Sequence, residues 1–401
     1  MLKFTTPKIN LKAIAVSKSA SKNFLILPMS MTSGGVTSTS INLAIGLTKT
    51  GHRVTLRSYV DDISSQQKQK LDKHNVTYET FGIKNFSTKQ TINIVCANYQ
   101  FIKHNQDSYD AVLHNGLIPS ILYCLPQKLT KNKTANIINF HTTLSQYFKT
   151  QNKLKSFLLK KLFSTIKHQV ILCNDSIEAA QDAAEELNVK DVIALYNPVC
   201  SKEDLLYKPG EAPHPWLSTP NLKTLISAGR LCKEKDFERM LNSFKILNNQ
   251  EPNTRLIILG DGEEKTRLEN LIDKLDLHHV VNLAGFQNNV HDYFYYADYF
   301  WLTSKYEGFG MVLCEALAMG TPCIAIDCPH GPKEILQNNK FGFLIPRDAT
   351  HAQMAKTIAC ALRESKNDKS FYRNRAQDFL DTKIAQEFIT LVNSKTQPKT
   401  N

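Results

Sequence analysis

The sequence predicts an α/β protein built from two doubly wound domains. Its 401 residues exceed the length at which a single hydrophobic core usually stops growing. Short apolar runs alternate with helical or polar segments, which indicates parallel sheets covered by helices. The alternation is interrupted once, at residues 200–221, by a polar segment with four prolines, which is typical of a linker between domains.

The first half of the chain is expected to form the first sheet. The loop after the first apolar run contains Gly34 and Gly35 and leads into a helical pattern that ends near Gly51. Residues 1–22 hold five lysines and no acid but lack a continuous apolar core, so they are expected to be a basic leader and not a signal peptide. The expected strands are residues 24–27, 54–56, 92–96, 111–113, 137–140 and 170–172.

The second half repeats this pattern. Its expected strands are residues 224–227, 255–259, 281–283, 300–303 and 323–326, and from about Ala352 the chain is expected to be helical. Because ligands of such sheets bind at the carboxyl ends of the strands, the site is expected between the two domains. The predicted organisation is an N-terminal domain at 23–199, a linker at 200–221, a second domain at 222–380, and a C-terminal helix with a polar tail at 381–401.

The nonapeptide 307–315, with the sequence EGFGMVLCE, is the most informative motif. Glu315 lies among apolar residues, where a carboxylate is costly unless it accepts hydrogen bonds. Gly308, Phe309 and Gly310 precede an apolar helix, whose first backbone N–H groups have no partner within the helix. These groups and Glu307 suit sugar hydroxyls or phosphate oxygens, and Glu315 suits two hydroxyls of a ribose. The alternative is an ordinary capped helix with a solvated acid.

Two cations follow the strand expected at 224–227. Arg230 and Lys235 would lie in the loop at the carboxyl end of that strand. An arginine fork and a lysine point charge suit a diphosphate. The alternative is a pair of surface cations that interact with Glu234 and Asp236.

Two further features also lie at the carboxyl ends of expected strands. Gly34 and Gly35 precede a helix, so they are either an anion site at its N-terminus or an ordinary tight turn. His141 follows the strand expected at 137–140 and is either a partner for a sugar hydroxyl or proton, or a structural histidine. The chain has neither a GxGxxG motif nor a Walker lysine, so a dinucleotide or P-loop site is disfavoured.

The net charge of +12 lies entirely in the first half. Residues 1–200 contain 24 Lys and Arg against 12 Asp and Glu, and residues 201–401 contain 25 of each. An anionic partner is expected there: phosphorylated lipid, acidic glycan or nucleic acid. The basic amphipathic pattern at 148–167 fits an anionic membrane surface, or a core helix with a solvated lysine face. Nucleic acid is disfavoured because aromatic residues for base stacking are not interleaved with the lysines.

The cysteine pattern and the hydropathy favour a cytoplasmic protein. The nine cysteines form no CxxC pair, and several lie in apolar runs, which fits reduced thiols better than a disulfide framework or a zinc site. No run approaches the roughly 20 apolar residues that span a bilayer. The first half would therefore meet a membrane only peripherally, at the inner face of the plasma membrane.

Together these motifs resemble the retaining glycosyltransferases of family 4, the group 1 transferases with the GT-B fold of two Rossmann-like domains. The resemblance covers residues 24 to 388, and its strongest part is the E-x7-E motif of residues 307–315. Residues 327–336 resemble bacterial members that build cell-surface glycans, such as lipopolysaccharide or capsule. The other matching landmarks are Gly229-Arg230-Leu231 with Lys235, Gly34-Gly35-Val36, Gly51-His52 and Gly260-Asp261-Gly262-Glu263.

The resemblance implies a nucleotide-sugar donor, UDP-linked rather than GDP-linked, and a glycan or lipid-linked acceptor. Arg230 and Lys235 would hold the donor diphosphate, with help from the backbone at Gly35. Glu315 would bind the ribose, and the loop at Gly285 and Phe286 would lie near the base.

For the donor sugar, the resemblance implies contacts from Glu307, from the amides of Gly308 to Gly310, and from His141. Members of the family transfer the sugar with retention of anomeric configuration and without a metal ion or other cofactor. The attack occurs on the face that the diphosphate leaves, and the leaving phosphate takes the acceptor proton.

The chain departs from the family pattern at two positions. Asp236 stands where a glycine is common, and Thr32 stands where glycogen-synthase relatives carry a lysine, which argues against a polyglucose synthase. Two other functions stay open: a GT-B-shaped nucleotide-sugar epimerase, and a non-catalytic nucleotide-sugar-binding subunit. The intact motifs at Arg230, Lys235, Glu307 and Glu315 disfavour both.

Overall fold

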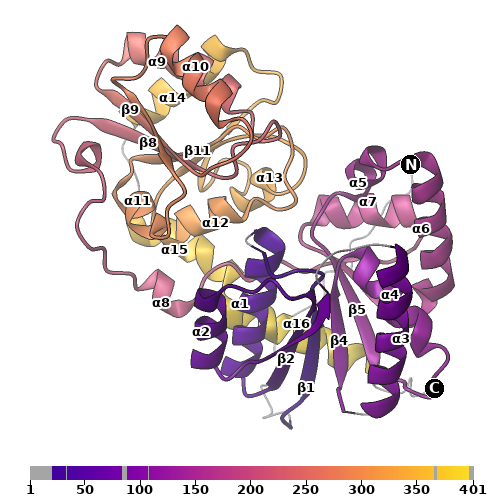
Figure 1. Cartoon of the computed structure of the whole chain (residues 1–401). Coiled ribbons are helices and arrows are strands. Elements are labelled where there is room, and N and C mark those ends of the chain that lie inside the picture. The colour runs from indigo at the N-terminus through magenta and orange to yellow at the C-terminus, as the bar shows by residue number, and fades with distance from the viewer. Residues whose placement is uncertain (1–19, 33, 84–87, 107, 365–367, 397–401) are drawn as a thin grey trace.

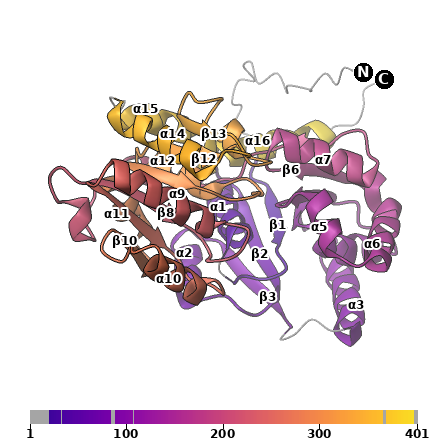
Figure 2. The same cartoon turned by 90° about the horizontal axis from the view of Figure 1, so that it is seen from above.

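The structure is a computed structural model that describes residues 20–32, 34–83, 88–106, 108–364 and 368–396. Within these residues it contains two parallel sheets, each with helices packed against it (Figures 1 and 2). Most of the expected leader and the end of the expected tail lie outside the described residues. No helix in the described part of the chain is long and apolar enough to cross a bilayer.

The first sheet has seven strands in the order β3-β2-β1-β4-β5-β6-β7, and all neighbours are parallel. The strand order reverses between β1 and β4, so the carboxyl ends of these strands form a crevice. The strands are β1 Asn23–Leu27, β2 Arg53–Val60, β3 Thr77–Ile83, β4 Ala111–Asn115, β5 Ala135–Phe140, β6 Val170–Asn174 and β7 Ile193–Ala194. The helices are α1 Gly35–Lys49, α2 Ser65–Lys73, α3 Thr88–His104, α4 Leu117–Gln127, α5 Leu144–Thr150, α6 Lys153–Ile166 and α7 Ile177–Leu187.

The second sheet has six strands in the order β10-β9-β8-β11-β12-β13, again all parallel. Its strands are β8 Lys223–Ala228, β9 Thr254–Leu259, β10 Val281–Gly285, β11 Tyr299–Leu302, β12 Cys323–Ile326 and β13 Gly342–Ile345. Its helices are α9 Phe237–Gln250, α10 Lys265–Lys274, α11 Val290–Tyr296, α12 Met311–Ala318, α13 Pro332–Ile335, α14 His351–Arg363 and α15 Lys369–Ala376. The short helix α8, Lys202–Leu205, precedes this sheet, and α16, Asp381–Thr396, follows it.

The continuous apolar runs became strands because both faces of each sheet are covered. In β1, Phe24 and Ile26 face a core shared with α1, whereas Leu25 and Leu27 face a core with Ile102 of α3. All four of these strand residues are at most 1% exposed. This burial on both sides is the usual reason why strands of parallel α/β sheets lack polar alternation.

The strand expected at residues 92–96 is wrong, because this run lies in α3. Ile94, Asn98 and Ile102 are buried at intervals of four residues, whereas Ile92 is 64% exposed. That spacing is helical, and a run of five residues is too short to separate the two periods. The sequence analysis also missed β3, β7 and β13, whose side chains are mostly half-buried or exposed.

The helix α16 returns to the first domain after the second sheet is complete (Figure 1). Ile384, Phe388 and Ile389 are buried in the same core as Phe24, and the rings of Phe24 and Phe388 lie 5.6 Å apart. At Gly46 of α1, an added Cβ would lie 2.2 Å from the carbonyl oxygen of Asp381. The first core therefore contains residues from both ends of the described chain.

We expect Gly46→Ala to destabilise the protein, because the new methyl group would force α1 and the start of α16 apart. Overpacking of this kind costs about 1–3 kcal/mol, which exceeds the gain in helix propensity of about 1 kcal/mol. Chemical denaturation followed by circular dichroism measures the change. The control is Ser38→Ala at an exposed position of the same helix, which should leave the midpoint within error. Equal midpoints for both variants would contradict the tight contact.

Candidate active site

The carboxyl edges of the two sheets meet at the N-termini of α1 and α12. The hydroxyl of Thr39 in α1 lies 3.4 Å from the sulfur of Met311, the first residue of α12. A Cβ added to Gly35 would lie 3.5 Å from the same sulfur. Gly34 and Gly35 are exposed at this point. The first N–H groups of a helix have no partner within the helix, so this end of α1 is suited to an anion.

The loop between β8 and α9 carries Arg230 and Lys235. Backbone hydrogen bonds hold it: the N–H of Leu231 donates to Asp261, and its carbonyl accepts from Glu264. The Arg230 side chain is 69% exposed, and its nearest carboxylate, on Glu263, lies 3.9 Å away. Arg230 is therefore fixed at its backbone and loosely paired at its guanidinium, so an anionic ligand could replace Glu263 at little cost.

Lys235 and Glu307 form a direct ion pair. The Lys235 Nζ atom lies 2.6 Å from Glu307 Oε1, and the hydroxyl of Ser304 donates to the same oxygen at 2.5 Å. The two charged side chains are 21% and 10% exposed. This pair joins the β8–α9 loop to the loop before α12, two segments that the sequence places 72 residues apart.

The glycine-rich turn before α12 touches the first domain. A Cβ added to Gly308 would lie 2.6 Å from the carbonyl oxygen of His141 and 3.9 Å from Oδ2 of Asp175. Only glycine permits this approach, so the two domains are in contact at the motif itself. The Phe309 side chain is 2% exposed and packs between the rings of Tyr196 and Phe379. Phe309 can therefore face a ligand only through its backbone.

His141 lies beside a buried carboxylate that the sequence did not single out. Its Nδ1 atom is 3.8 Å from Asp175 Oδ2, and the two side chains are 7% and 2% exposed. The amide of Asn197 donates to the same Asp175 oxygen at 3.0 Å. The distance from His141 is longer than a hydrogen bond, so the ring and the carboxylate are adjacent but not locked together.

Several buried polar atoms at or after the carboxyl ends of the strands of the first sheet, His141 among them, have no hydrogen-bond partner among the described residues. Buried polar groups in folded proteins are nearly always paired, so such a cluster is suited to a ligand rich in hydroxyl groups. A sequence signal existed in retrospect, since most of these residues lie at or just after the carboxyl ends of β4, β5 and β6. The unpaired atoms belong to both ring nitrogens of His141 and to Asp175, Thr143, Asn115, Asn139 and Asn197.

Glu315 lies in the second turn of α12, as the apolar pattern predicted. No hydrogen bond or ion pair to its carboxylate is present within the described part of the chain. Burial raises the pKa of Glu315 from 4.5 to about 7, with a further increase from Asp204 and opposing effects from Lys70 and Lys235. The carboxylate is therefore destabilised here until it gains a donor.

Gly285 and Phe286 lie at the carboxyl end of β10, beside the loop that supports Arg230. The carbonyl of Gly285 accepts a hydrogen bond from the N–H of Gly260 at 2.8 Å. The Phe286 side chain is 67% exposed. A large exposed ring next to the loop of Arg230 is suited to stacking on a planar ligand.

Glu334 of α13 was not singled out from the sequence, and its carboxylate accepts hydrogen bonds from the first domain. It accepts from the hydroxyl of Tyr196 at 2.7 Å and from the first N–H of α7, on Ile177, at 3.0 Å. The partners are 138 and 157 residues away in the chain, so no local pattern could reveal them. Burial raises the pKa of Glu334.

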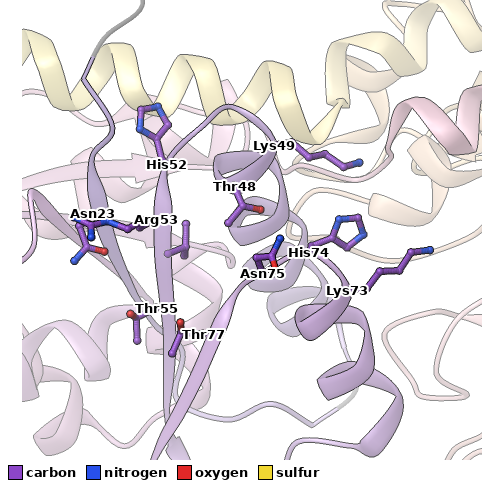
Figure 3. Close-up of a pocket in the computed structure, with 11 residues that line it drawn as sticks. Asn23, Thr48, Lys49, His52, Arg53, Thr55, Lys73, His74, Asn75 and Thr77 are labelled. Carbon is purple, nitrogen blue, oxygen red and sulfur yellow. The ribbon is translucent and has the colours of Figure 1, made fainter.

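Two cavities lie away from these residues. One, of about 640 Å³, is lined by residues at the amino ends of β1, β2 and β3, including His52, Arg53 and Thr77 (Figure 3). The other, of about 970 Å³, lies at the amino ends of β5 and β6. Ligands of parallel sheets bind at the opposite edge, and neither cavity contains a predicted site residue, so we assign the site by its motifs.

One group among the described residues has the composition of a metal site. Asp276, His278 and His279 lie just after α10, with ligand atoms within 4.8 Å of one another. All three are exposed, and they lie outside the predicted motifs. Exposed clusters of this kind are common without a metal.

Comparison with known proteins identifies the second domain. Residues 211–378 match the family model for glycosyl transferases group 1. This segment is a group 1 glycosyltransferase domain. Its boundaries include the loop of Arg230 and Lys235 and the whole turn from Glu307 to Glu315.

The fold of the whole chain is GT-B, as predicted. The structure of Anabaena HepE in complex with UDP superposes with a TM-score of 0.74 and 19% identity, covering 93% of this chain and all of HepE. The apo form of the lipopolysaccharide outer core galactosyltransferase WaaB gives a TM-score of 0.70 at 18% identity, with coverage of 93% and 99%. At these identities the likeness establishes the fold alone.

Curated relatives connect the glycosyltransferase domain with glycan biosynthesis. The N-acetylgalactosamine-N,N'-diacetylbacillosaminyl-diphospho-undecaprenol 4-alpha-N-acetylgalactosaminyltransferase of Campylobacter jejuni is 29% identical over 277 residues, 66% of this chain and 71% of that protein. An uncharacterized glycosyltransferase of Methanocaldococcus jannaschii is 41% identical over 111 residues, 28% of this chain. The match spans only 27% of the Methanocaldococcus protein's length.

The raised pKa of Glu315 predicts a pH-dependent loss of stability. The unfolded chain releases this proton near pH 4.5 and the folded protein near pH 7, so stability falls as pH rises through this interval and is then constant. Glu315→Gln has no such proton and should be the more stable protein above pH 7, by about 2–3 kcal/mol. Denaturant titrations of both proteins at pH 5, 6, 7 and 8 measure the difference. A difference independent of pH would show that Glu315 has an ordinary pKa.

Proposed function

We propose that this protein is a retaining glycosyltransferase that uses a nucleotide sugar, UDP-linked, to extend a cell-surface glycan or a lipid-linked acceptor. The observation that carries the proposal is the Lys235–Glu307 pair at 2.6 Å, held where Gly308 touches His141 of the other domain. This contact lies where the loop of Lys235, the turn before α12 and the first domain meet, which supports a ligand held between the sheets.

The relatives support this proposal. HepE, which shares the fold, was solved with UDP and with UDP-glucose. The Campylobacter relative is named for transfer of N-acetylgalactosamine to a diphospho-undecaprenol-linked sugar. A UDP-linked donor and a lipid-linked acceptor are therefore the first substrates to test.

In the proposed reaction, the loop of Arg230 and Lys235 meets the donor diphosphate. The exposed Arg230 guanidinium supplies a bidentate fork, and Lys235 supplies a point charge that Glu307 holds in place. As the bond between the anomeric carbon and the phosphate oxygen breaks, these cations stabilise the growing negative charge. The acceptor hydroxyl attacks from the same face, and its proton passes to the departing phosphate oxygen.

The other residues position the donor. Glu315 accepts hydrogen bonds from the two ribose hydroxyls, which supply the donors its carboxylate lacks, and Phe286 stacks on the base. The N–H groups near Gly34 and Gly35 face the diphosphate, and those of Gly308 to Gly310 face the sugar. Glu307, bonded to Lys235 and Ser304, orients sugar hydroxyls and is not a nucleophile.

Asp175 is proposed as a positioning residue for His141. The carboxylate, anchored by Asn197, favours the ring orientation in which Nδ1 faces Asp175 and Nε2 faces the sugar. The proposal names no metal or other cofactor. Transfer that persists in EDTA would agree with it, and loss that Mg²⁺ or Mn²⁺ restores would overturn this part.

The place of action is proposed to be the cytoplasmic face of the plasma membrane. Lipid-linked acceptors are held there, and the excess positive charge of the first half suits anionic lipid.

We expect Lys235→Ala to lower kcat/KM by about 10²–10³, because it removes a charge that stabilises the leaving diphosphate. The exposed Lys233, two positions earlier in the same loop, is the matched control, and Lys233→Ala should behave like the wild type. Initial rates with radiolabelled UDP-sugars, in transfer or in slow donor hydrolysis, measure both. Equal rates for Lys235→Ala and wild type would overturn the assignment.

A double-mutant cycle tests Asp175. If Asp175 acts through His141, Asp175→Asn should lower kcat about tenfold with little change in the donor KM, and should have no further effect in a His141→Ala background. Additive losses in the double variant would instead indicate an independent or purely structural role. Thermal denaturation of each variant shows whether folding is affected.

A thermal-shift screen identifies the nucleotide and separates the alternatives. We expect UDP and UDP-sugars to raise the melting temperature of the wild type more than GDP or ADP compounds do. The same ligands should not raise the melting temperature of Arg230→Ala. NMR of the donor without acceptor distinguishes an epimerase, which would change the sugar configuration while the diphosphate stays bound to it. Nucleotide-sugar binding without hydrolysis or transfer would favour a non-catalytic subunit.

A further inference from the structure

The helix α6 has an outer face that neither the core nor the candidate active site uses. Its inner face packs through Phe163 and Ile166, which are 1% and 0% exposed. The outer face presents four large apolar side chains to solvent, which we call the α6 stripe: Leu154, Phe157, Leu158 and Leu162, exposed by 68%, 62%, 47% and 40%.

The α6 stripe is a continuous surface on one side of the helix. Leu154 precedes the buried Phe163 by nine positions, and at about 100° per residue the two point in opposite directions. The four side chains follow the spacing i, i+3, i+4 and i+8, so each is next to another along the helix. Contiguous exposed apolar patches of this kind are typical of interaction sites.

The side chains near the α6 stripe are positively charged, which favours an anionic partner. Lys153, Lys155 and Lys161 lie on the same helix, and none has a carboxylate within 4.0 Å among the described residues. Lys160 is different, because it is paired with Glu186 at 2.7 Å. The whole segment 111–174 contains nine lysines and no aspartate or glutamate.

We propose that α6 docks on a bilayer containing anionic lipid, with the α6 stripe in the interface and the three lysines against lipid phosphates. Exposed apolar side chains with lysines beside them suit the surface of an anionic membrane. Lysine stems extend along apolar surface while their charges reach the headgroups. A second copy of this chain fits poorly on the same face, because it would oppose lysines with lysines and offers no acid there.

The position of α6 connects docking with the candidate active site. α6 lies on the side of the first domain that faces away from the second domain (Figures 1 and 2). It follows α5, which begins three residues after His141. Docking would therefore hold the first-domain part of the candidate active site, at His141, near a lipid-linked acceptor. The inference extends the membrane location under the proposed function, but vesicle binding requires no nucleotide sugar.

Flotation of the full-length protein with vesicles of phosphatidylcholine and phosphatidylglycerol, 70:30 against 100:0, tests the proposal. We expect binding to the anionic vesicles that weakens at high salt. Phe157→Ser/Leu158→Ser should lower the partition coefficient at least about tenfold. Lys153→Gln/Lys155→Gln/Lys161→Gln should lower it by roughly a hundredfold on anionic vesicles and little on neutral ones.

Matched controls lie elsewhere on the surface. Leu206, 77% exposed, follows α8, and Leu206→Ser should leave vesicle binding unchanged. So should Lys274→Gln/Lys356→Gln, at exposed positions of the second domain. Donor hydrolysis should be equal in all variants, which separates this inference from the proposed enzyme activity. Unchanged flotation of both α6 variants would overturn the proposal, and so would light scattering that shows α6-dependent dimers in place of vesicle binding.

Discussion

The close approach of Gly308 to the carbonyl of His141 is the contact on which the candidate active site depends. It brings the turn before α12 against the carboxyl edge of the first sheet, so that motifs from both domains face one volume. Around it, Lys235 is fixed by Glu307, and Glu307 by Ser304. These contacts connect the loop of Lys235, the turn of Glu307 and His141, although more than 90 residues of chain separate His141 from Lys235.

Some polar side chains of the candidate site are paired with one another, whereas others are buried without a hydrogen-bond partner among the described residues. Lys235 and Glu307 neutralise one another at close range, so the free protein holds this pair at little electrostatic cost. Glu315 and the atoms around His141 lack comparable partners, and burial raises the pKa of Glu315. The paired groups give rigidity, whereas the unpaired groups are where a ligand has the most to contribute.

Much of the fold was predictable because both sheets are buried on two sides. Short apolar runs that alternate with helical segments, such as those of β1, β5 and β12, indicate buried strands of a parallel sheet. Residues 92–96 lie in a helix and not in the expected strand, because an apolar run of five residues does not distinguish the two periods. β3, β7 and β13 were not predicted because half-exposed strands lack a strong hydrophobic signal.

The site was predictable where its chemistry is local. The motif of Glu307 to Glu315 and the loop of Arg230 and Lys235 are short, and the structure places Lys235 against Glu307. Asp175 and Asn197 follow strands, but polar residues after strands are common, so their positions alone do not single them out. Glu334 was not predictable, because its partners lie 138 and 157 residues away in the chain. Two cavities lie at the other edge of the first sheet, so a cavity alone does not identify the candidate site.

The return of α16 to the first domain has a consequence for biosynthesis. On the ribosome, residues 23–199 emerge long before α16, so the apolar surface around Phe24 and Ile41 stays uncovered until α16 has been made. The second domain, whose own strands and helices are contiguous from 223 to 376, can complete its core earlier. The second domain can therefore fold before the first domain, although it is translated later. α16 then completes the core of the first domain.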